Sequence, residues 1–402
     1  MLKLLHTADW HLGQIFYDND RRKEHAYFLE QLKQIVARRN IDVLLVAGDV
    51  FDSPNPSADA QEMYYRFLHE ITAQNPALQI IIIAGNHDSA LRLEAPNPLL
   101  KILNISIIGV VKKHGQSVDY KSLIVPIKQR GKTVAWCLAV PYLRMGDYPA
   151  AENYSQGVEK LFAELIENIP DKSLPVVAMA HLQASGATIS KNDKSERLII
   201  GGEEGISEKA LPTNLAYFAL GHLHRAQHLP HRENACYSGA PLPMSFAERT
   251  NKQGVMYVEI SEEETKIEKI EIPPLIALQN ITAQSVSELL DKLIKLPEGD
   301  KNDAPYLEIK VKIDQPEPTL RHRIEEILET KAVNLARLQS YSPNYNENRT
   351  DYSDLASDWH APNPFEMALE IHKRFYGGAE MSDSIKKLLK TTIEELEIQE
   401  NL

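Results

Sequence analysis

The chain has 402 residues, of which 43% are hydrophobic and 25% charged, and its net charge is −12 at pH 7. This length can form one large domain with one or two smaller ones. The acidic balance argues against a protein that coats nucleic acid through bulk charge, although divalent cations can invert the field of an acidic enzyme site. No segment approaches the roughly 20 apolar residues of a membrane span. Two cysteines without a CxxC pair, Cys137 and Cys236, favour reduced core thiols, and we expect a soluble, cytoplasmic protein with no membrane partner.

Short apolar runs alternate with amphipathic stretches in the first half of the chain. Their periodicity predicts buried strands at residues 2–7, 41–47 and 79–84, with helices at residues 22–39 and 58–73 between them. This βαβαβ order is typical of a sheet with helices packed against it. Further strands are predicted at residues 122–125, 133–140, 175–180 and 216–220, followed by an antiparallel pair at 255–260 and 266–272.

The pattern restarts after Pro274, where we place the end of the large domain. Residues 275–340 predict a small βαβαβ unit with two helical stripes. Its middle strand is expected to be half-buried, because Leu307 and Ile309 alternate with the charged Glu308 and Lys310.

The last segment, residues 341–402, has a different character. Residues 341–357 are polar without a sustained period and predict a linker. Two helices are predicted beyond it, at residues 364–376 and 384–399. The sequence leaves open whether these helices dock on a partner or fold back on the main body.

Polar residues follow the predicted strands at the points where the strands end. The carboxyl ends of strands in an α/β sheet meet at one edge, so residues far apart in sequence can converge there. The residues in these positions are Asp9, His11, Asp49, Asn86, His87, Asp88, His181, His222 and His224.

The residue types in this set favour a metal site. Carboxylate, amide and imidazole ligands are harder than the thiolates of a cysteine metal site. The set also contains more nitrogen ligands than a calcium site would have. The set is large enough for two adjacent ions that share one carboxylate. Two metals about 3.5–4 Å apart can activate a water molecule and neutralise the charge on both sides of an in-line attack on phosphorus. Gly48, Gly85 and Gly221 would let the backbone turn sharply beside them.

Each motif taken alone also has a structural interpretation. An isolated Asp-x-His pair rarely binds metal, and Gly-Asp after a strand is commonly a turn. Asp52 and Asp88 could orient ligand imidazoles or cap the helices that follow. His6 is expected to support the site rather than bind metal, and His25 to be a surface or packing residue. The five motifs in this order make coincidence remote.

The five motifs together resemble those of a known family. The order Asp-x-His, Gly-Asp, Gly-Asn-His-Asp, His, Gly-His-x-His resembles the signature of calcineurin-like metallophosphoesterases. The residues around these motifs are typical of a smaller family within that class. They are His6-Thr-Ala-Asp-Trp-His-Leu-Gly13, Gly48-Asp-Val-Phe-Asp52, Gly221-His-Leu-His224 and Ser238-Gly-Ala-Pro-Leu-Pro-Met-Ser-Phe246. These resemble the SbcD family, the nuclease subunits of bacterial SbcC–SbcD complexes and relatives of the Mre nucleases. The resemblance is strong over residues 1 to about 275.

The resemblance implies an α/β fold with a calcineurin-like β-sandwich flanked by helices, plus a small α+β capping domain and C-terminal helices. Residues 1–274 would be the nuclease domain, 275–340 the capping domain that orients DNA, and 341–402 the linker and partner-binding helices. The family's roles carry over to matching positions. Asp9, His11, Asp49 and His224 would hold one Mn²⁺; Asp49, Asn86, His181 and His222 would hold a second; His87 would act on the scissile phosphate or protonate the leaving oxygen.

The resemblance also implies an activity and partners. These are a 3'–5' exonuclease on double-stranded DNA ends and an endonuclease on hairpins and single strands, in DNA repair, recombination and replication. The partners would be an SbcC-type ATPase and a second copy of the chain, within a heterotetramer associated with the nucleoid.

Two other functions stay open. One is a phosphatase or phosphodiesterase with the same metals and a small substrate, for which residues 275–402 would have no purpose. The other is a scaffold that binds DNA ends without cutting, which would not need an intact ligand set.

Overall fold

The computed structural model describes residues 1–341 except residues 116, 186, 188–204 and 314–316, and beyond them residues 365, 369, 372 and 381–389. The chain divides into two compact units, Met1–Ser342 and Pro343–Leu402. In the second unit, residues 365, 369, 372 and 383–389 are helical; the rest of the two predicted C-terminal helices, and the linker after Tyr341, lie outside the described residues.

A six-stranded sheet forms the first layer of the large unit. Its strand order is β16-β15-β1-β4-β5-β6. The strands are β1 (Leu2–Thr7), β4 (Val43–Ala47), β5 (Gln79–Ile83), β6 (Ile105–Ile108), β15 (Gly254–Ile260) and β16 (Thr265–Glu271). From β1 to β6 neighbours run parallel, whereas β15 runs antiparallel to β1 and pairs with β16 as predicted.

A second six-stranded sheet forms the facing layer, in the order β13-β14-β12-β11-β10-β9. Its strands are β9 (Ile124–Gln129), β10 (Lys132–Val140), β11 (Val176–His181), β12 (Tyr217–Gly221), β13 (Gln227–Leu229) and β14 (Arg232–Tyr237). The strands β10, β11, β12 and β14 are parallel. The predicted strand at residues 122–125 begins only at Ile124, because a 3₁₀ turn occupies Tyr120–Leu123.

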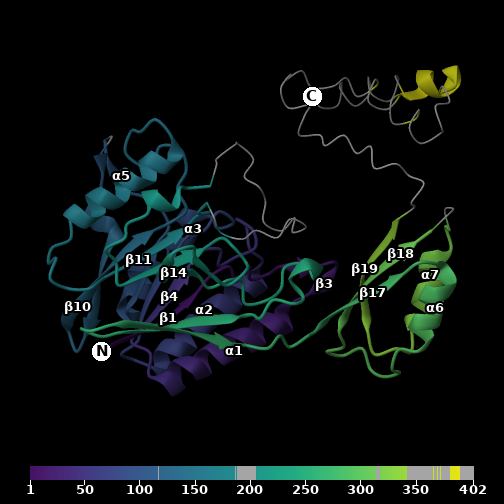
Figure 1. The fold of residues 1–402 in the computed structure, drawn as a ribbon, viewed down its shortest axis with the longest axis horizontal. Helices are drawn as coiled ribbons and strands as arrows, with labels where there is room; N and C mark the ends of the chain where they lie inside the picture. Colours follow the sequence, from purple (N-terminus) through teal and green to yellow (C-terminus); the bar gives the residue numbers. More distant parts are fainter. Residues whose placement is uncertain are drawn as a thin grey trace. The chain divides into compact units, whose positions relative to one another are not determined.

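Alternation of side chains along β1 joins the layers. Leu4 belongs to the core shared by both sheets, together with Leu138 of β10 and Phe218 of β12. Leu5 points to the opposite face and joins the core with Phe28 of the first helix. The sequence therefore folds as a β-sandwich with helices outside it, and the predicted fold class is confirmed (Figure 1).

The helices that precede Pro274 cover the sandwich (Figure 1). They are α1 (Arg22–Arg39), α2 (Ala58–Gln74), α3 (Ala90–Glu94), α4 (Asn97–Leu100) and α5 (Tyr154–Glu167). Short pairs and turns complete this part of the chain: β2 (Ile15–Phe16), β3 (Asn19–Asp20), β7 (Lys113–His114), β8 (Ser117–Val118), η1 (Lys101–Leu103), η2 (Tyr120–Leu123), η3 (Glu208–Ala210) and η4 (Phe246–Glu248). No described helix is long and apolar enough to cross a membrane.

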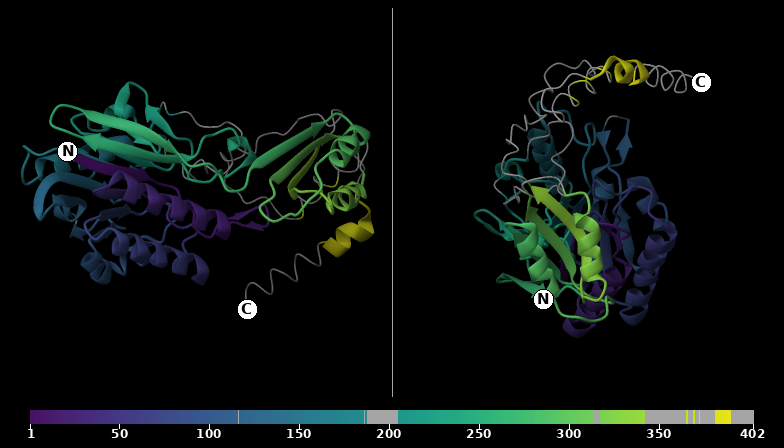
Figure 2. Two further views of the ribbon diagram at one scale, coloured as in Figure 1. Left: turned by 90° about the horizontal axis from the view of Figure 1, so that it is seen from below. Right: turned by 90° about the vertical axis from the view of Figure 1, so that its right-hand side faces the viewer.

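A three-stranded parallel sheet forms after Pro274, with two helices on one of its faces (Figures 1 and 2). Its elements follow the predicted βαβαβ order: β17 (Leu278–Ala283), α6 (Val286–Ile294), β18 (Tyr306–Lys312), α7 (Leu320–Leu328) and β19 (Asn334–Tyr341). Leu289, Ile309 and Ile324 belong to a core separate from that of the sandwich.

The half-buried character predicted for the middle strand is wrong at one position. The Glu308 carboxylate is fully buried. Asn280 of β17 donates a hydrogen bond to it at 2.7 Å, and Arg337 of β19 donates another at 3.1 Å. Lys310 approaches it to 3.0 Å. Polar partners on both neighbouring strands therefore allow the carboxylate to be buried.

Candidate metal centre

The eight residues predicted to bind metal or act in catalysis all lie at the carboxyl ends of strands, and both sheets contribute. The first sheet supplies five of them: Asp9 and His11 after β1, Asp49 after β4, and Asn86 and His87 after β5. The second sheet supplies three: His181 at the last position of β11, and His222 and His224 after β12.

The loops that carry these residues are tied to one another through the backbone. The Asp9 N–H donates to the carbonyl of Gly48 at 3.0 Å, and the His11 N–H donates to the carbonyl of Asp49 at 3.0 Å. Asp9, His11, Asp49 and His222 all have positive φ angles, of 54°, 47°, 48° and 103°. Such angles are uncommon outside glycine, and strain of this kind concentrates at functional sites.

One group of potential ligands consists of Asp9, His11 and His224. Their ligand atoms lie within 4.8 Å of one another, and all three side chains are buried. The ring centroids of His11 and His224 are 5.3 Å apart. Neither ring nitrogen of His11 has a hydrogen-bond partner among the described residues. A buried imidazole in that condition is poorly satisfied by protein alone and is well suited to bind a cation.

A second group gathers around Asn86. Its Oδ1 lies 2.9 Å from Nε2 of His181 and 3.1 Å from Nδ1 of His222. His181 Nε2 also lies 3.3 Å from Oδ2 of Asp49. The other nitrogen of His181, Nδ1, is 2.8 Å from the Ala47 carbonyl, so Nδ1–H donates there and Nε2 faces the group. Amide, carboxylate and imidazole donors thus converge on one point.

Asp49 lies between the two groups. Its Oδ2 is 3.3 Å from His181 and 3.7 Å from Nε2 of His11, and its Oδ1 accepts the His87 N–H at 2.8 Å. Gly85 makes room for it, because a Cβ at Gly85 would overlap the Asp49 carboxylate and amide nitrogen. One carboxylate therefore faces both sets of imidazoles, as a shared ligand must.

Burial and proximity set the protonation of this centre. Burial lowers the pKa of His222 to about 3, which leaves its imidazole neutral at physiological pH. Burial alone would raise the pKa of Asp49, but His181 and His11 hold it far below its usual range. Burial would lower the pKa of His181, yet Asp49 and Asp9 raise it to about 9. A cation bound beside Asp49 would replace the His181 proton as the balancing charge.

His87 has a different environment from the other imidazoles. It is only partly buried. Its Nδ1 lies 2.9 Å from the Asp52 carbonyl, which can only accept, so Nδ1–H donates and Nε2 remains for a substrate. Its ring centroid is 4.8 Å from that of His11. This geometry suits proton transfer at the rim of the centre.

The two carboxylates with open roles, Asp52 and Asp88, turn out to brace the site rather than cap helices. Oδ1 of Asp52 lies 3.3 Å from Nδ1 of His11. Asp88 accepts the N–H groups of Val50, Phe51 and Gly85 at 3.2, 3.0 and 2.9 Å and so joins the loops after β4 and β5.

Other histidines lie close by without joining the centre. His6 is buried with Nδ1 at 2.8 Å from the Tyr217 hydroxyl. His25 is also buried, as a packing residue would be. Sequence reasoning missed one neighbour, Glu248, whose Oε1 lies 3.6 Å from Nδ1 of His224. Its only sequence signal is its position two residues after the Ser238–Phe246 motif.

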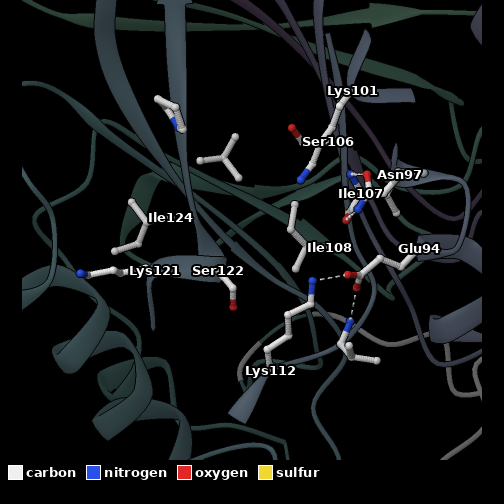
Figure 3. Close-up of a pocket in the computed structure, with 13 residues that line it drawn as sticks. Glu94, Asn97, Lys101, Ser106, Ile107, Ile108, Lys112, Lys121, Ser122 and Ile124 are labelled. Atoms are coloured by element: carbon white, nitrogen blue, oxygen red, sulfur yellow. Dashed lines mark hydrogen bonds and ion pairs between the residues drawn. The ribbon is translucent and has the colours of Figure 1, made fainter. Parts of the chain in front are cut away.

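A cavity of about 270 Å³ lies elsewhere, beside the edge strands β6 and β9 (Figure 3). Glu94 and Lys112, which form an ion pair of 2.6 Å, line it together with Lys101 and Ser122. None of the predicted site residues lines this cavity, so it is separate from the candidate centre.

Similarity to known proteins agrees with this architecture. The family profile described as calcineurin-like phosphoesterase matches residues 2–226, and the one described as Type 5 capsule protein repressor C-terminal domain matches residues 274–359. The SbcD subunit of nuclease SbcCD from Rhodobacter capsulatus is 34% identical over 85% of this chain and 88% of its own. The Escherichia coli K12 protein of the same name is 28% identical, with 83% of each chain covered. The Bacillus subtilis 168 protein is 31% identical over 64% of this chain and 66% of its own.

The profile match covers more than half of the chain, and it includes all eight residues of the candidate centre. The similarity to the Rhodobacter capsulatus protein extends well beyond that domain. The chain belongs to the calcineurin-like phosphoesterases and, within them, to the SbcD family of nuclease subunits.

Proposed function

We propose that this chain hydrolyses phosphodiester bonds at double-stranded DNA ends and in hairpins, as the nuclease subunit of a DNA-end-processing complex. The observation that carries the proposal is the convergence of Asp49, Asn86 and His181 on one point, with the partly exposed His87 beside it. Membership in the SbcD family supports DNA as the substrate.

Two Mn²⁺ ions are the proposed cofactors. Asp9, His11 and His224, with Asp49, would hold one ion. Asp49, Asn86, His181 and His222 would hold the other. The mixed oxygen and nitrogen donors suit a first-row divalent ion of intermediate softness. Asp49 is the proposed shared ligand, because its Oδ2 faces both His11 and His181.

The residues of this chain would divide the reaction among them. When bound, the two metal ions would act as Lewis acids that activate water and offset the negative charge that develops on the phosphate. The carboxylates Asp9 and Asp49 would take part in no proton transfer and would serve only to hold that charge. His181 is oriented by its hydrogen bond to Ala47, so that its Nε2 stays in place throughout.

His87 is the proposed general acid. With Nδ1–H held by the Asp52 carbonyl at 2.9 Å, Nε2 is the atom from which a proton would pass to the leaving oxygen. Its backbone N–H is fixed to Asp49 at 2.8 Å, so the ring keeps a constant position relative to the proposed metals. General acids of this kind contribute about 10²–10⁴-fold to rate.

The remaining segments would serve DNA and partners. Residues 275–340 are the proposed capping domain that orients DNA, and residues 341–402 the proposed linker and docking helices for an SbcC-type ATPase. The activities expected are 3'–5' exonuclease on duplex ends and endonuclease on hairpins. We expect the protein to work in the cytoplasm in association with the nucleoid, where such ends arise.

A homodimer within a heterotetramer is also proposed. Three large apolar side chains on three successive short helices are mostly exposed: Leu91 (72%) on α3, Leu99 (72%) on α4 and Ile102 (82%) on η1. A contiguous exposed apolar patch is typical of an association surface, and the proposal is that these three side chains form one. A second copy of the chain is the occupant proposed for this surface.

The test is a cleavage assay with Mn²⁺ on linear and hairpin duplex DNA, with and without an SbcC-type partner and ATP. Bis-p-nitrophenyl phosphate serves as a small diester. Mn²⁺-dependent DNA cutting supports the proposal. Hydrolysis of the small diester with DNA left intact under every condition would move the chain to a small-substrate phosphodiesterase.

His87→Ala tests the proposed general acid. Cleavage should fall by about 10²–10⁴-fold while Mn²⁺ binding, followed by calorimetry, stays at the wild-type level. Unchanged cleavage by this variant would remove His87 from the reaction.

A further inference from the structure

A buried carboxylate with no part in the proposed reaction lies against the centre. Glu248 ends the short helix η4, and its side chain is only 3% exposed. Its Oε2 accepts the Met244 N–H at 3.1 Å, and its Oε1 lies 3.6 Å from Nδ1 of His224. A carboxylate beside one nitrogen of an imidazole fixes the tautomer and directs the other nitrogen away from it.

The backbone that carries Met244 is itself held by a buried arginine. Arg21 is fully buried and donates from Nη1 to the carbonyl of Pro243 at 2.7 Å. The same nitrogen donates to Oε1 of Gln14 at 2.9 Å, and the Gln14 amide contacts the Met244 sulfur at 2.9 Å. The Pro243–Met244 segment is thus fixed from two sides.

Arg21 in turn pairs with Glu24, which connects it to the segment after Pro274. The guanidinium donates to both carboxylate oxygens of Glu24, at 2.7 and 3.0 Å, and Glu24 is fully buried. The Tyr306 hydroxyl, at the first position of β18, donates to Oε2 of Glu24 at 3.1 Å. The Tyr306 ring packs against Phe16, and Phe16 packs against Phe246, in one buried apolar cluster.

We propose that Glu248 is a positioning residue for His224 and that Tyr306 helps to hold it there, through Glu24, Arg21 and the Pro243–Met244 backbone. The inference rests on the proposed function, because it takes His224 as a ligand of one Mn²⁺ ion. With Nδ1 turned toward Glu248, His224 presents Nε2 to the ion. The βαβαβ unit that contains Tyr306 therefore tunes metal affinity besides any contact that it makes with DNA.

The physical reason is that the side chains of this network are buried and that two of them, Arg21 and Glu24, form a buried ion pair. A buried carboxylate that loses one hydrogen-bond donor is left with an unsatisfied acceptor, and its ion pair can shift to recover a partner, whereas an exposed carboxylate would replace the donor with water. Arg21 is the only link between Glu24 and Pro243 among the hydrogen bonds of the described residues. A shift of the guanidinium therefore moves the segment on which Glu248 depends.

The test is a Mn²⁺ titration of the full chain by calorimetry and by electron paramagnetic resonance. Glu248→Ala should weaken one of two Mn²⁺ sites by roughly 10–100-fold and leave the other unchanged. Glu248→Gln should bind as weakly as the alanine variant, because it removes the negative charge that lies 3.6 Å from Nδ1 of His224. A purely structural role would instead be rescued by glutamine, and that rescue would overturn the proposal.

The second arm examines the distant end of the network. Tyr306→Phe removes one hydroxyl and should weaken the same Mn²⁺ site by roughly two- to tenfold. Tyr257→Phe is the matched control: it removes a hydroxyl that donates to Glu259 at 3.2 Å in β15, and it should leave both sites unchanged. Equal affinities for the Tyr306 variant and wild type would overturn the link to β18.

These outcomes are separable from those of the proposed function. A wild-type chain that binds two Mn²⁺ ions but cuts no DNA fails the proposed function, and the affinities of the variants still decide the present inference. Wild type that binds no Mn²⁺ overturns both. Melting in EDTA, measured for every variant, identifies any loss of folding, and a variant that binds weakly only because it has unfolded counts against the proposal.

Discussion

Replacement of Gly85 by alanine puts a methyl group against the carboxylate that the two proposed Mn²⁺ positions share. The new Cβ would overlap both Oδ1 and the backbone nitrogen of Asp49. Gly85 is not among the described glycines with positive φ, so its backbone accepts alanine and the cost is steric alone. Because the obstructing atoms include backbone, a rotamer change of Asp49 cannot remove the clash.

The magnitude follows from these contacts. Overpacking of a well-packed interior costs about 1–3 kcal/mol of unfolding free energy. Relief of the clash must displace the loop that carries Asp49, and so both Mn²⁺ sites should weaken, each by at least roughly 100-fold. Calorimetric titration with Mn²⁺ measures the affinities, and thermal melts in EDTA measure the steric cost without metal.

Gly205→Ala is the matched control. Its Cβ would meet nothing closer than the Ser185 backbone nitrogen at 3.4 Å, an ordinary contact, and its φ is not positive. This variant should bind two Mn²⁺ ions like wild type. If Gly85→Ala also titrated two ions with wild-type affinity, Asp49 would not be the shared ligand.

Three further predictions rest on other parts of the molecule. Asp52→Asn weakens the contact with His11 Nδ1 and should lower Mn²⁺ affinity roughly tenfold. Asp171→Asn, at an exposed turn, is the control and should leave the affinity unchanged. Equal Mn²⁺ affinities for the Asp52 variant and wild type would contradict the bracing role. Leu99→Asp with Ile102→Asp should convert the proposed dimer to monomer in light scattering, and a dimer that persists would place the interface elsewhere. Burial raises the pKa of the Cys236 thiol to about 11 and raises the pKa of the Cys137 thiol further. At pH 8 neither thiol should therefore react with a disulfide reagent until the chain is unfolded. Rapid labelling of the native protein would refute their burial.

Local pattern was sufficient for much of the fold. The helix at residues 22–39 matches α1, and the isoleucine run at 80–83 lies within β5, because a fully buried strand and an amphipathic helix each leave a strong periodic signal. The helix α5 went unpredicted although Val158, Leu161 and Leu165 have helical spacing. The spacing of these three apolar residues is sufficient to predict the helix from the sequence.

Features that depend on distant partners could not be read in this way. The strand β14 is defined by parallel pairing with β12, and nothing local distinguishes it from a loop. Glu308 looked like an outward-facing residue because its strand alternates, and only Asn280 and Arg337 on the flanking strands explain its burial. The same holds for Glu248, whose importance depends on the fold bringing it to His224.

The candidate centre was predictable as a set but not as a geometry. Each residue follows a strand, and the carboxyl ends of strands meet, so convergence was a reasonable expectation. The sequence did not indicate that the Ala47 carbonyl would orient His181, or that the Asp52 carbonyl would leave Nε2 of His87 free. Backbone carbonyls carry no sequence signal, and their contribution appears only in three dimensions.

The pairing of β1 has a consequence for synthesis of the protein. One side of β1 pairs with β4, which follows soon after it, but the other side pairs with β15, where Leu2 lies opposite Ile260. At ribosomal rates of 5–20 residues per second, on the order of 10–50 s separate the emergence of the two strands. During that interval β1 is an open edge that invites chaperone binding or misassembly. Asp9 follows β1 directly, whereas His222 and His224 emerge shortly before β15, so a growing chain can complete its nuclease centre only when the sheet is about to close.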